Sequence, residues 1–138
     1  MNTVPRTVLI VDDEASLRRV LERSLTRHGY RMLGAGSAET AYELLASEPA
    51  DAVLIDIHLP TMSGTALYLA ILHRWPALDG RMAIMTGDAE ADEVRTWLER
   101  HHCTVLSKPF NLQAVADWLA GVLKSRDDEL ERQGGARA

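Results

Sequence analysis

The stretch Val8-Leu9-Ile10-Val11-Asp12-Asp13 places two carboxylates directly after four consecutive apolar residues. Such a run is typical of a strand that is buried on both faces of a parallel sheet. Three later stretches repeat the arrangement and lead into a charged or hydroxyl-bearing residue: Ala52-Val53-Leu54-Ile55-Asp56, Met82-Ala83-Ile84-Met85-Thr86 and Cys103-Thr104-Val105-Leu106-Ser107-Lys108. The fold and the candidate site are both predicted from these four stretches.

Helical patterns separate these runs. We expect strands over about residues 7–11, 30–35, 52–55, 81–85 and 103–106, and helices over about residues 15–28, 38–47, 64–74, 89–100 and 112–124. Gly29 is expected to end the first helix, and Ser37 to begin the second as its N-cap. The alternation predicts an α/β fold, a (βα)5 doubly wound five-stranded parallel sheet with helices on both faces. The strand at 30–35 contains Arg31, which is compatible with an edge position.

The apolar positions of the helices predict which side chains reach the core. The last helix is expected to bury Leu112, Val115, Leu119, Val122 and Leu123. Trp75 is expected to pack at the end of the third helix, and Cys103 to lie inert in the core.

The chain has 138 residues, of which 46% are hydrophobic, so one domain with a sizeable core is expected over residues 1–124. The charged segment 125–138 is either a frayed extension or a continuation of the last helix, and both alternatives stay open. The net charge of −5 argues against a nucleic-acid partner. A single cysteine indicates a cytoplasmic protein, and no apolar run is long enough to span a membrane.

Because the carboxyl ends of parallel strands share one edge of the sheet, Asp12, Asp13, Asp56, Thr86 and Lys108 are expected to meet in one pocket. Three clustered carboxylates repel one another, and a divalent cation removes this conflict. Mg²⁺ prefers oxygen ligands and typically combines one or two carboxylates with water and phosphate oxygens. Zinc is a poor fit, because no cysteine or histidine cluster accompanies the acids.

The same residues suit the transfer of a phosphoryl group. A carboxylate such as Asp56 can attack phosphorus as a nucleophile and form an aspartyl phosphate. The Lys108 ammonium and the Thr86 hydroxyl can then bind phosphoryl oxygens. The structural alternative is that Asp12 or Asp13 merely caps the helix that follows. Helix capping does not explain why four strands in succession lead into a charged or hydroxyl-bearing residue.

These residues resemble the receiver domains of two-component response regulators, which are phosphoacceptor modules with a flavodoxin-like fold. The resemblance covers about residues 6–123 and implies the strand order 2-1-3-4-5. It rests on four motifs in the family's order: Val8-Leu9-Ile10-Val11-Asp12-Asp13-Glu14, Leu54-Ile55-Asp56-Ile57-His58-Leu59-Pro60-Thr61-Met62-Ser63-Gly64, Met85-Thr86-Gly87 and Lys108-Pro109-Phe110.

The resemblance implies that Asp56 accepts a phosphoryl group from a histidine of a sensor kinase or a histidine phosphotransfer protein. Thr86 would move toward the phosphoryl group and Lys108 would pair with it. Such a domain is not an enzyme acting on a separate substrate, since it catalyses only its own phosphorylation and dephosphorylation. Partners would dock near the first helix, whose outward residues are expected to be Arg18, Arg19, Glu22, Arg23, Thr26 and Arg27.

The resemblance also implies a metal site. Asp13, Asp56 and the backbone carbonyl of His58 would ligate Mg²⁺ directly, and Asp12 would act mainly through water. The His58 side chain either faces solvent or contacts the phosphoryl group and alters its lifetime.

Other implied features concern loops and switching. Pro60 and Gly64 would shape the loop after the acceptor, and Pro109 would follow a cis peptide bond. Receiver domains commonly carry an aromatic residue three positions before the lysine, where this chain has Val105. An aromatic rotamer switch is therefore in doubt, and movement of the loop over residues 87–92 and of the fourth helix is the alternative.

Phosphorylation would change the face formed by the fourth helix, the fifth strand and the fifth helix. Trp97 and Trp118 lie at the edges of the core stripes of those helices, so they either cover core edges or form a homodimer or output-protein interface. His101 and His102 are expected to cap the fourth helix rather than bind metal.

Three alternatives make different demands on the sequence. A phosphatase of the haloacid-dehalogenase type needs a second aspartate two positions after the nucleophile, where this chain has His58. A pseudo-receiver would be expected to lack one of the acids, the threonine or the lysine, and all are present. A receiver excised from a hybrid histidine kinase, acting in a phosphorelay, stays open.

Overall fold

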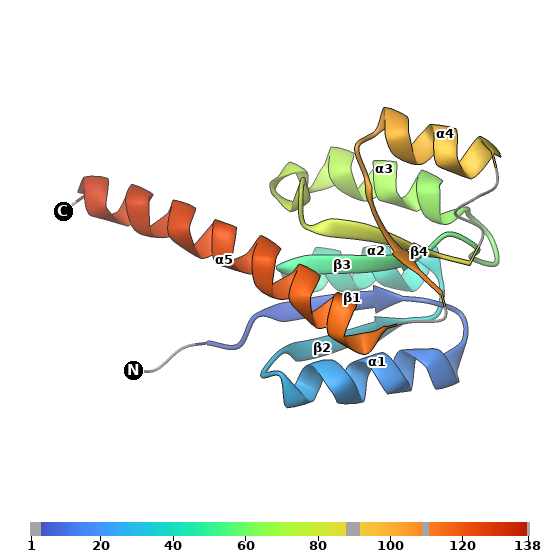
Figure 1. Cartoon of the computed structure of the whole chain (residues 1–138), viewed down its shortest axis with the longest axis horizontal. Helices are drawn as coiled ribbons and strands as arrows, with labels where there is room; N and C mark the ends of the chain where they lie inside the picture. The colour runs from blue at the N-terminus through green and yellow to red at the C-terminus, as the bar shows by residue number, and fades with distance from the viewer. Residues whose placement is uncertain (1–3, 88–91, 109–110, 138) are drawn as a thin grey trace.

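The computed structural model describes residues 4–87, 92–108 and 111–137, and the side chains within these ranges except those of 92–94 and 125–137. A parallel five-stranded sheet lies at its centre, in the order β2-β1-β3-β4-β5 (Figure 1). This confirms the expected order and places β2 at an edge. The strands are β1 Thr7–Val11, β2 Arg31–Ala35, β3 Ala52–Asp56, β4 Met82–Thr86 and β5 Thr104–Ser107.

The helices also agree with the expected alternation. They are α1 Ala15–Arg27, α2 Ala38–Ser47, α3 Gly64–Arg74, α4 Asp92–Arg100 and α5 Leu112–Arg137, and the short 3-10 turn η1 Pro76–Leu78 follows α3. The predicted start of the fourth helix, near residue 89, lies outside the described residues. In Figure 1, α5 projects well past the sheet, so residues 125–137 follow the helical alternative. A domain boundary at residue 124 stays a prediction.

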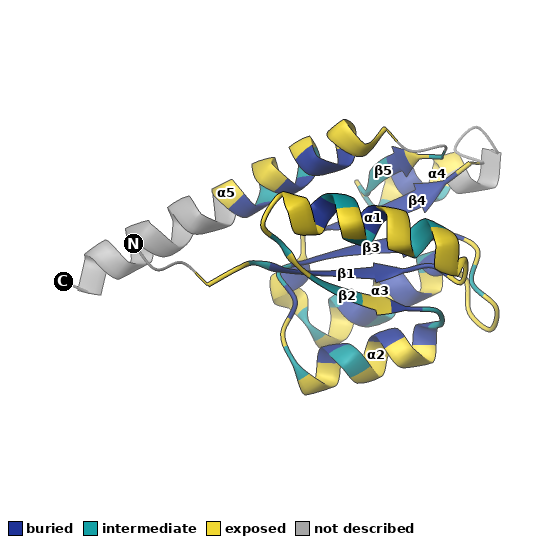
Figure 2. Ribbon diagram, turned by 90° about the horizontal axis from the view of Figure 1, so that it is seen from below, coloured by how far each residue is buried: buried dark blue, intermediate teal, exposed yellow. Residues whose placement is uncertain are grey.

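The central strands feed two hydrophobic clusters, one on each face of the sheet. Every residue of β1, β3 and β4 is buried, as their unbroken apolar runs predict (Figure 2). Leu9, Val53 and Ile84 face the cluster that α2, α3 and α4 cover, whereas Ile10 and Leu54 face the cluster that α1 and α5 cover. The prediction of helices on both faces is confirmed.

Most of the predicted core side chains of α5 reach the second cluster. Val115, Leu119 and Leu123 are buried and Val122 is partly buried. The prediction for Leu112 is wrong, because its side chain is 37% exposed. Leu112 is the first residue of α5, one turn before the helix meets the cluster at Val115.

Local signals place the helix ends. Ser37 begins α2 as predicted, since its Oγ accepts a hydrogen bond from the Thr40 N–H at 3.2 Å. Gly29 ends α1 with φ +94°, while the Gly29 and Tyr30 N–H groups donate to the carbonyls of Thr26 and Leu25. This pair of bonds is a Schellman motif, in which glycine supplies the left-handed residue.

The end of α4 has the same motif built on a histidine. The His102 and Cys103 N–H groups donate to the carbonyls of Glu99 and Leu98, and His102 adopts φ +50°. The His101 ring bonds to the Trp97 carbonyl at 2.9 Å. The prediction that both histidines cap α4 is therefore confirmed.

We predict that His102→Gly stabilises the protein by about 1 kcal/mol, because glycine removes the steric cost of a left-handed residue that carries a Cβ. Urea denaturation measures this change in the free energy of unfolding. Gly29→Ala at the matching position of α1 should destabilise by a similar amount. A His102→Gly protein less stable than the wild type would show that the imidazole contributes more than the strain costs.

Candidate phosphoacceptor and metal site

The carboxyl ends of β1, β3, β4 and β5 bring the predicted residues together. Asp56 is the last residue of β3 and pairs with Met85, while Thr86 ends β4 and pairs with Ser107. The Lys108 N–H donates to the Thr86 carbonyl at 3.0 Å, which continues the β4–β5 ladder to the lysine. The sheet register thus sets the positions of the Asp56 carboxylate, the Thr86 hydroxyl and the Lys108 ammonium.

The three acids form one cluster. Each of Asp12, Asp13 and Asp56 offers a carboxylate oxygen, and these oxygens all lie within 4.8 Å of one another. Asp12 and Asp56 are buried, whereas Asp13 is exposed. Neither Asp12 nor Asp13 caps α1, because the N-cap is Glu14, which makes no side-chain cap bond. The alternative of simple helix capping is therefore not supported.

Lys108 bridges the two buried acids. Its Nζ lies 3.1 Å from Asp12 Oδ2 and 3.3 Å from Asp56 Oδ2. Burial alone would lower the pKa of the Lys108 ammonium, but its hydrogen bonds to the two carboxylates and their charges outweigh burial and raise this pKa. The ammonium is therefore fully charged at neutral pH, as the binding of a phosphoryl oxygen requires.

Asp56 is in a less favourable electrostatic position. Burial raises the pKa of its carboxyl, and the negative charge of Asp12 raises it further. The His58 N–H, which donates to Asp56 Oδ1 at 3.3 Å, and the Lys108 ammonium act in the opposite direction without overcoming the rise. One lysine therefore does not fully compensate for the clustered carboxylates.

The donor set fits a hard divalent cation. The cluster supplies carboxylate oxygens only, and a second positive charge would relieve the pKa rise at Asp56. The exposure of Asp13 leaves access for water, which Mg²⁺ retains in most protein sites. Asp12, Asp13 and Asp56 are the residues that would hold the ion, and the ligand role of the His58 carbonyl stays a prediction.

The loop after Asp56 closes tightly onto α3. The Gly64 N–H donates to the Ile57 carbonyl at 2.8 Å, and Ser63 Oγ accepts from the Ala66 N–H at 3.2 Å as the N-cap of α3. A Cβ on Gly64 would overlap the main-chain carbonyl of Asp56 and lie 2.7 Å from Ile57 Cα. Gly64 therefore shapes this loop, as expected, while the His58 side chain is exposed, as in its solvent-facing alternative.

Sequence reasoning misplaced one residue near the site. Arg18 was expected to point outward from α1, but it is half-buried, and its Nη1 donates to the Asp12 carbonyl at 2.6 Å. The available signal was the stretch Gly34-Ala35-Gly36, whose two glycines leave room for a side chain beside the end of β1.

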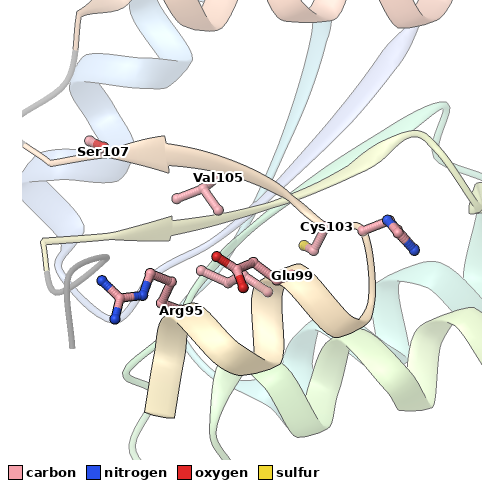
Figure 3. A pocket seen from close by; sticks show the side chains of 7 residues that line it. Arg95, Glu99, Cys103, Val105 and Ser107 are labelled. Carbon is pink, nitrogen blue, oxygen red and sulfur yellow. The ribbon is translucent and has the colours of Figure 1, made fainter. Parts of the chain in front are cut away.

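A groove of about 540 Å³ lies between α4 and the edge strand β5 (Figure 3). Val105 lies on its floor, where the family commonly has an aromatic residue, and the Arg95 and Glu99 side chains extend from α4. The residues that line the groove are Arg95, Leu98, Glu99, His102, Cys103, Val105 and Ser107.

The tryptophans behave as core-edge residues. Trp97 packs edge-on against Tyr68, with 5.5 Å between the ring centroids, and stacks on His101, with 4.2 Å between the ring centroids. Trp118 packs against the hydrophobic cluster that α1 and α5 cover. Trp75 packs at the end of α3 against Tyr42, as predicted.

Cys103 is only partly buried, yet burial raises its pKa to about 11 and keeps the thiol protonated.

Comparison with known proteins gives a consistent result. Residues 8–120 match the family described as "Response regulator receiver domain". Sporulation initiation phosphotransferase F of Bacillus subtilis (strain 168) is 31% identical over 112 residues, which are 80% of this chain and 87% of that protein. The DNA-binding transcriptional regulator NtrC of Escherichia coli (strain K12) is 36% identical over 110 residues. That match covers 79% of this chain and 23% of NtrC, so the chain spans less than a quarter of that regulator.

Solved structures agree on the fold. The signal receiver domain of an HD domain-containing protein from Pseudomonas fluorescens Pf-5 superposes with a TM-score of 0.80 at 28% identity, covering 96% of this chain and 98% of that one. A CheY-like receiver domain from Methanospirillum hungatei JF-1 gives a TM-score of 0.82 at 24% identity, covering 91% of this chain and 99% of that one.

Among the described residues, no helix is both long and apolar enough to cross a membrane.

We predict that Gly64→Ala destabilises the protein by about 1–3 kcal/mol, because the added Cβ forces the end of β3 away from α3. Urea denaturation measures the loss. Gly121→Ala in α5 is the control, since a Cβ there meets nothing within 4 Å and alanine favours a helix. Equal stability of Gly64→Ala and the wild type would contradict the close packing of the loop that follows Asp56.

A second prediction follows from the raised pKa of Asp56. Folding opposes ionisation of this carboxyl, so its destabilising effect is fully present above the folded-state pKa and vanishes below the ordinary value of 3.8. In metal-free buffer at neutral pH, Asp56→Asn should therefore be more stable than the wild type, and its advantage should shrink as the pH falls toward 3.8.

Denaturation with a chelator present, repeated across this pH range, measures the difference. Asp79→Asn, at an exposed position, is the control and should show no such advantage. A pH-independent advantage of Asp56→Asn would assign the effect to packing instead of charge.

Proposed function

The chain belongs to the family of response regulator receiver domains, and from this premise we propose that it is a signalling module phosphorylated on Asp56. The observation that carries the proposal is the Lys108 ammonium held between Asp12 and Asp56, with Asp13 at the mouth of the same cluster. This arrangement combines a nucleophile, a fixed positive charge and a set of oxygen ligands for a cation.

The proposed reaction is transfer from a phosphohistidine of a partner protein. A carboxylate oxygen of Asp56 attacks phosphorus, an O–P bond forms and the N–P bond to the imidazole breaks. The electron pair of that bond returns to the imidazole nitrogen, so no oxidant or further reactant is needed. Catalysis of such a transfer is mostly positioning and charge neutralisation.

The chain's own residues supply both. The Lys108 ammonium, already 3.3 Å from Asp56 Oδ2, binds a phosphoryl oxygen once Asp56 carries the group. The Thr86 hydroxyl, from the neighbouring strand end, donates to another oxygen. The buried Asp12 and the exposed Asp13 would hold Mg²⁺ together with Asp56. When bound, Mg²⁺ neutralises charge on the carboxylates and on the transferring group.

The partners are proposed to be a sensor histidine kinase or a histidine phosphotransfer protein in the cytoplasm. On this proposal the chain is no enzyme toward a separate substrate and catalyses only its own phosphorylation and dephosphorylation. A role in a phosphorelay is the second candidate. It is supported by the relative named a phosphotransferase, 87% of whose length the match covers.

The signal is proposed to leave through the face of α4, β5 and α5, toward an output protein or a second copy of the chain. Val105 lacks the bulk of an aromatic switch residue, and Trp97 is held between Tyr68 and His101. Movement of α4 relative to β5 is therefore the proposed response, because the groove between them leaves space for it.

Intact mass after incubation with acetyl phosphate and Mg²⁺ tests the acceptor chemistry. We expect one phosphoryl adduct on the wild type and none on Asp56→Asn or without Mg²⁺. The matched control is Asp51→Asn, which removes an acid from the opposite end of β3 and should leave the adduct intact.

An adduct that persists on Asp56→Asn would contradict the assignment of the acceptor. If acetyl phosphate gives no adduct, the same assay with phosphorylated histidine kinases decides the matter. Failure with both donors would identify a pseudo-receiver, which binds partners without accepting phosphate.

A further inference from the structure

The guanidinium of Arg18 reaches from α1 to the main chain beneath the acidic cluster. Its Nη1 donates to the Asp12 carbonyl at 2.6 Å. Two glycines at the end of β2 make room for it, since a Cβ on Gly36 would lie 3.3 Å from Nη1, and a Cβ on Gly34 would lie 3.6 Å from Nε and collide with the Glu22 carboxylate. The small residues and the arginine thus form one fitted contact.

This contact completes the fixation of Asp12. The Asp12 N–H donates to the Ala35 carbonyl at 3.0 Å, Oδ1 accepts from the Glu14 N–H at 2.9 Å, and Oδ2 accepts from Lys108 Nζ at 3.1 Å. The carbonyl oxygen is the remaining polar atom, and Arg18 holds it. Because the peptide bond is planar, the direction of this carbonyl also sets the plane of the Asp13 N–H.

Asp13 depends on its backbone for its aim. Its carboxylate is exposed, and among the side chains that the structure describes none forms a hydrogen bond or ion pair with that carboxylate. When only its own main chain holds a metal-ligating side chain, the precision of its position depends on the rigidity of that main chain. The peptide between Asp12 and Asp13 is therefore the element that orients the exposed acid.

We propose that Arg18 is a positioning residue for the cation site: by clamping the Asp12 carbonyl against the end of β2, it aims Asp13 at Mg²⁺ and raises the affinity for the ion. The inference deepens the proposed function and rests on it, because Mg²⁺ is the ion that this function needs. Outer residues that orient metal ligands commonly affect metal affinity strongly.

Electrostatics alone predicts the opposite sign. A guanidinium close to the cluster repels a divalent cation, so removal of its charge should tighten Mg²⁺ binding. Weaker binding after the loss of Arg18 can therefore not be an effect of charge. Arg19, the next residue of α1, is exposed and carries the same charge, which makes it a matched control.

The experiment is a calorimetric titration of the full chain with Mg²⁺. Arg18→Ala should raise the dissociation constant about tenfold. Arg18→Lys, which keeps the charge and one donor, should recover part of the loss. Gly36→Ala, which crowds Nη1 from β2, should show a smaller loss with Arg18 still present. Arg19→Ala should bind Mg²⁺ as tightly as the wild type or slightly more tightly.

The rate of phosphorylation by acetyl phosphate gives a second readout. For Arg18→Ala, the Mg²⁺ concentration at half-maximal rate should rise, while the rate at saturating Mg²⁺ should equal that of the wild type. Unchanged or tighter Mg²⁺ binding by Arg18→Ala, or an equal loss in Arg19→Ala, would overturn the proposal. A rate that stays low at saturating Mg²⁺ would also overturn it.

Mg²⁺ binding is measured without any phosphodonor, so the two proposals fail separately. Normal Mg²⁺ binding by a wild type that is never phosphorylated would count against the proposed function only. A wild type that does not bind Mg²⁺ would overturn both. Urea midpoints in chelator, measured for every variant, identify any variant whose loss reflects unfolding, and Arg18→Lys and Gly36→Ala then decide.

Discussion

The contact on which the site depends is the ammonium of Lys108 between two buried carboxylates, 3.1 Å from Asp12 and 3.3 Å from Asp56. Asp12 and Asp56 lie at the ends of adjacent strands, so the sheet itself forces like charges together. The single lysine keeps this arrangement foldable but leaves the pKa of Asp56 raised. This residual electrostatic cost suits a cation site, because the positive charge of a divalent ion would relieve it.

The rest of the fold holds this edge rigid. Every residue of β1, β3 and β4 is buried, and hydrophobic clusters on both faces of the sheet fix the strand ends from above and below. Three main-chain hydrogen bonds then fix the residues of the site relative to the strands. The Lys108 N–H donates to the Thr86 carbonyl, the Ile57 N–H to the Met85 carbonyl and the Gly64 N–H to the Ile57 carbonyl. Apolar packing along the strands is therefore separated in space from the clustered carboxylates at their carboxyl ends.

Much of this was predictable because it depends on residue type and periodicity. Four apolar runs that end in Asp12, Asp56, Thr86 and Lys108 sufficed for the parallel sheet and for the pocket. Contacts that depend on three-dimensional fit were not predictable. The exposure of Leu112 depends on where α5 meets the sheet, and the inward turn of Arg18 depends on space beside glycines of another strand. The left-handed His102 was not predictable for a different, local reason, since no glycine marks the end of α4.

Val105 lies on the strand that connects the candidate site with the proposed output face. Lys108 directly follows β5, and β5 borders the groove beside α4 along its length, so one strand lies next to both regions. Val105 is smaller than an aromatic residue, so its side chain leaves the groove open. A signal that passes this position then does not require the rotation of a large ring. Instead, α4 packs on the core through the buried Leu98 and through Trp97, which contacts Tyr68 of α3. On the proposed function, a shift at the end of β4 or β5 would reach the surface as a small displacement of α4 against this aromatic contact. The energy of that response would be limited by how differently the two positions of α4 pack.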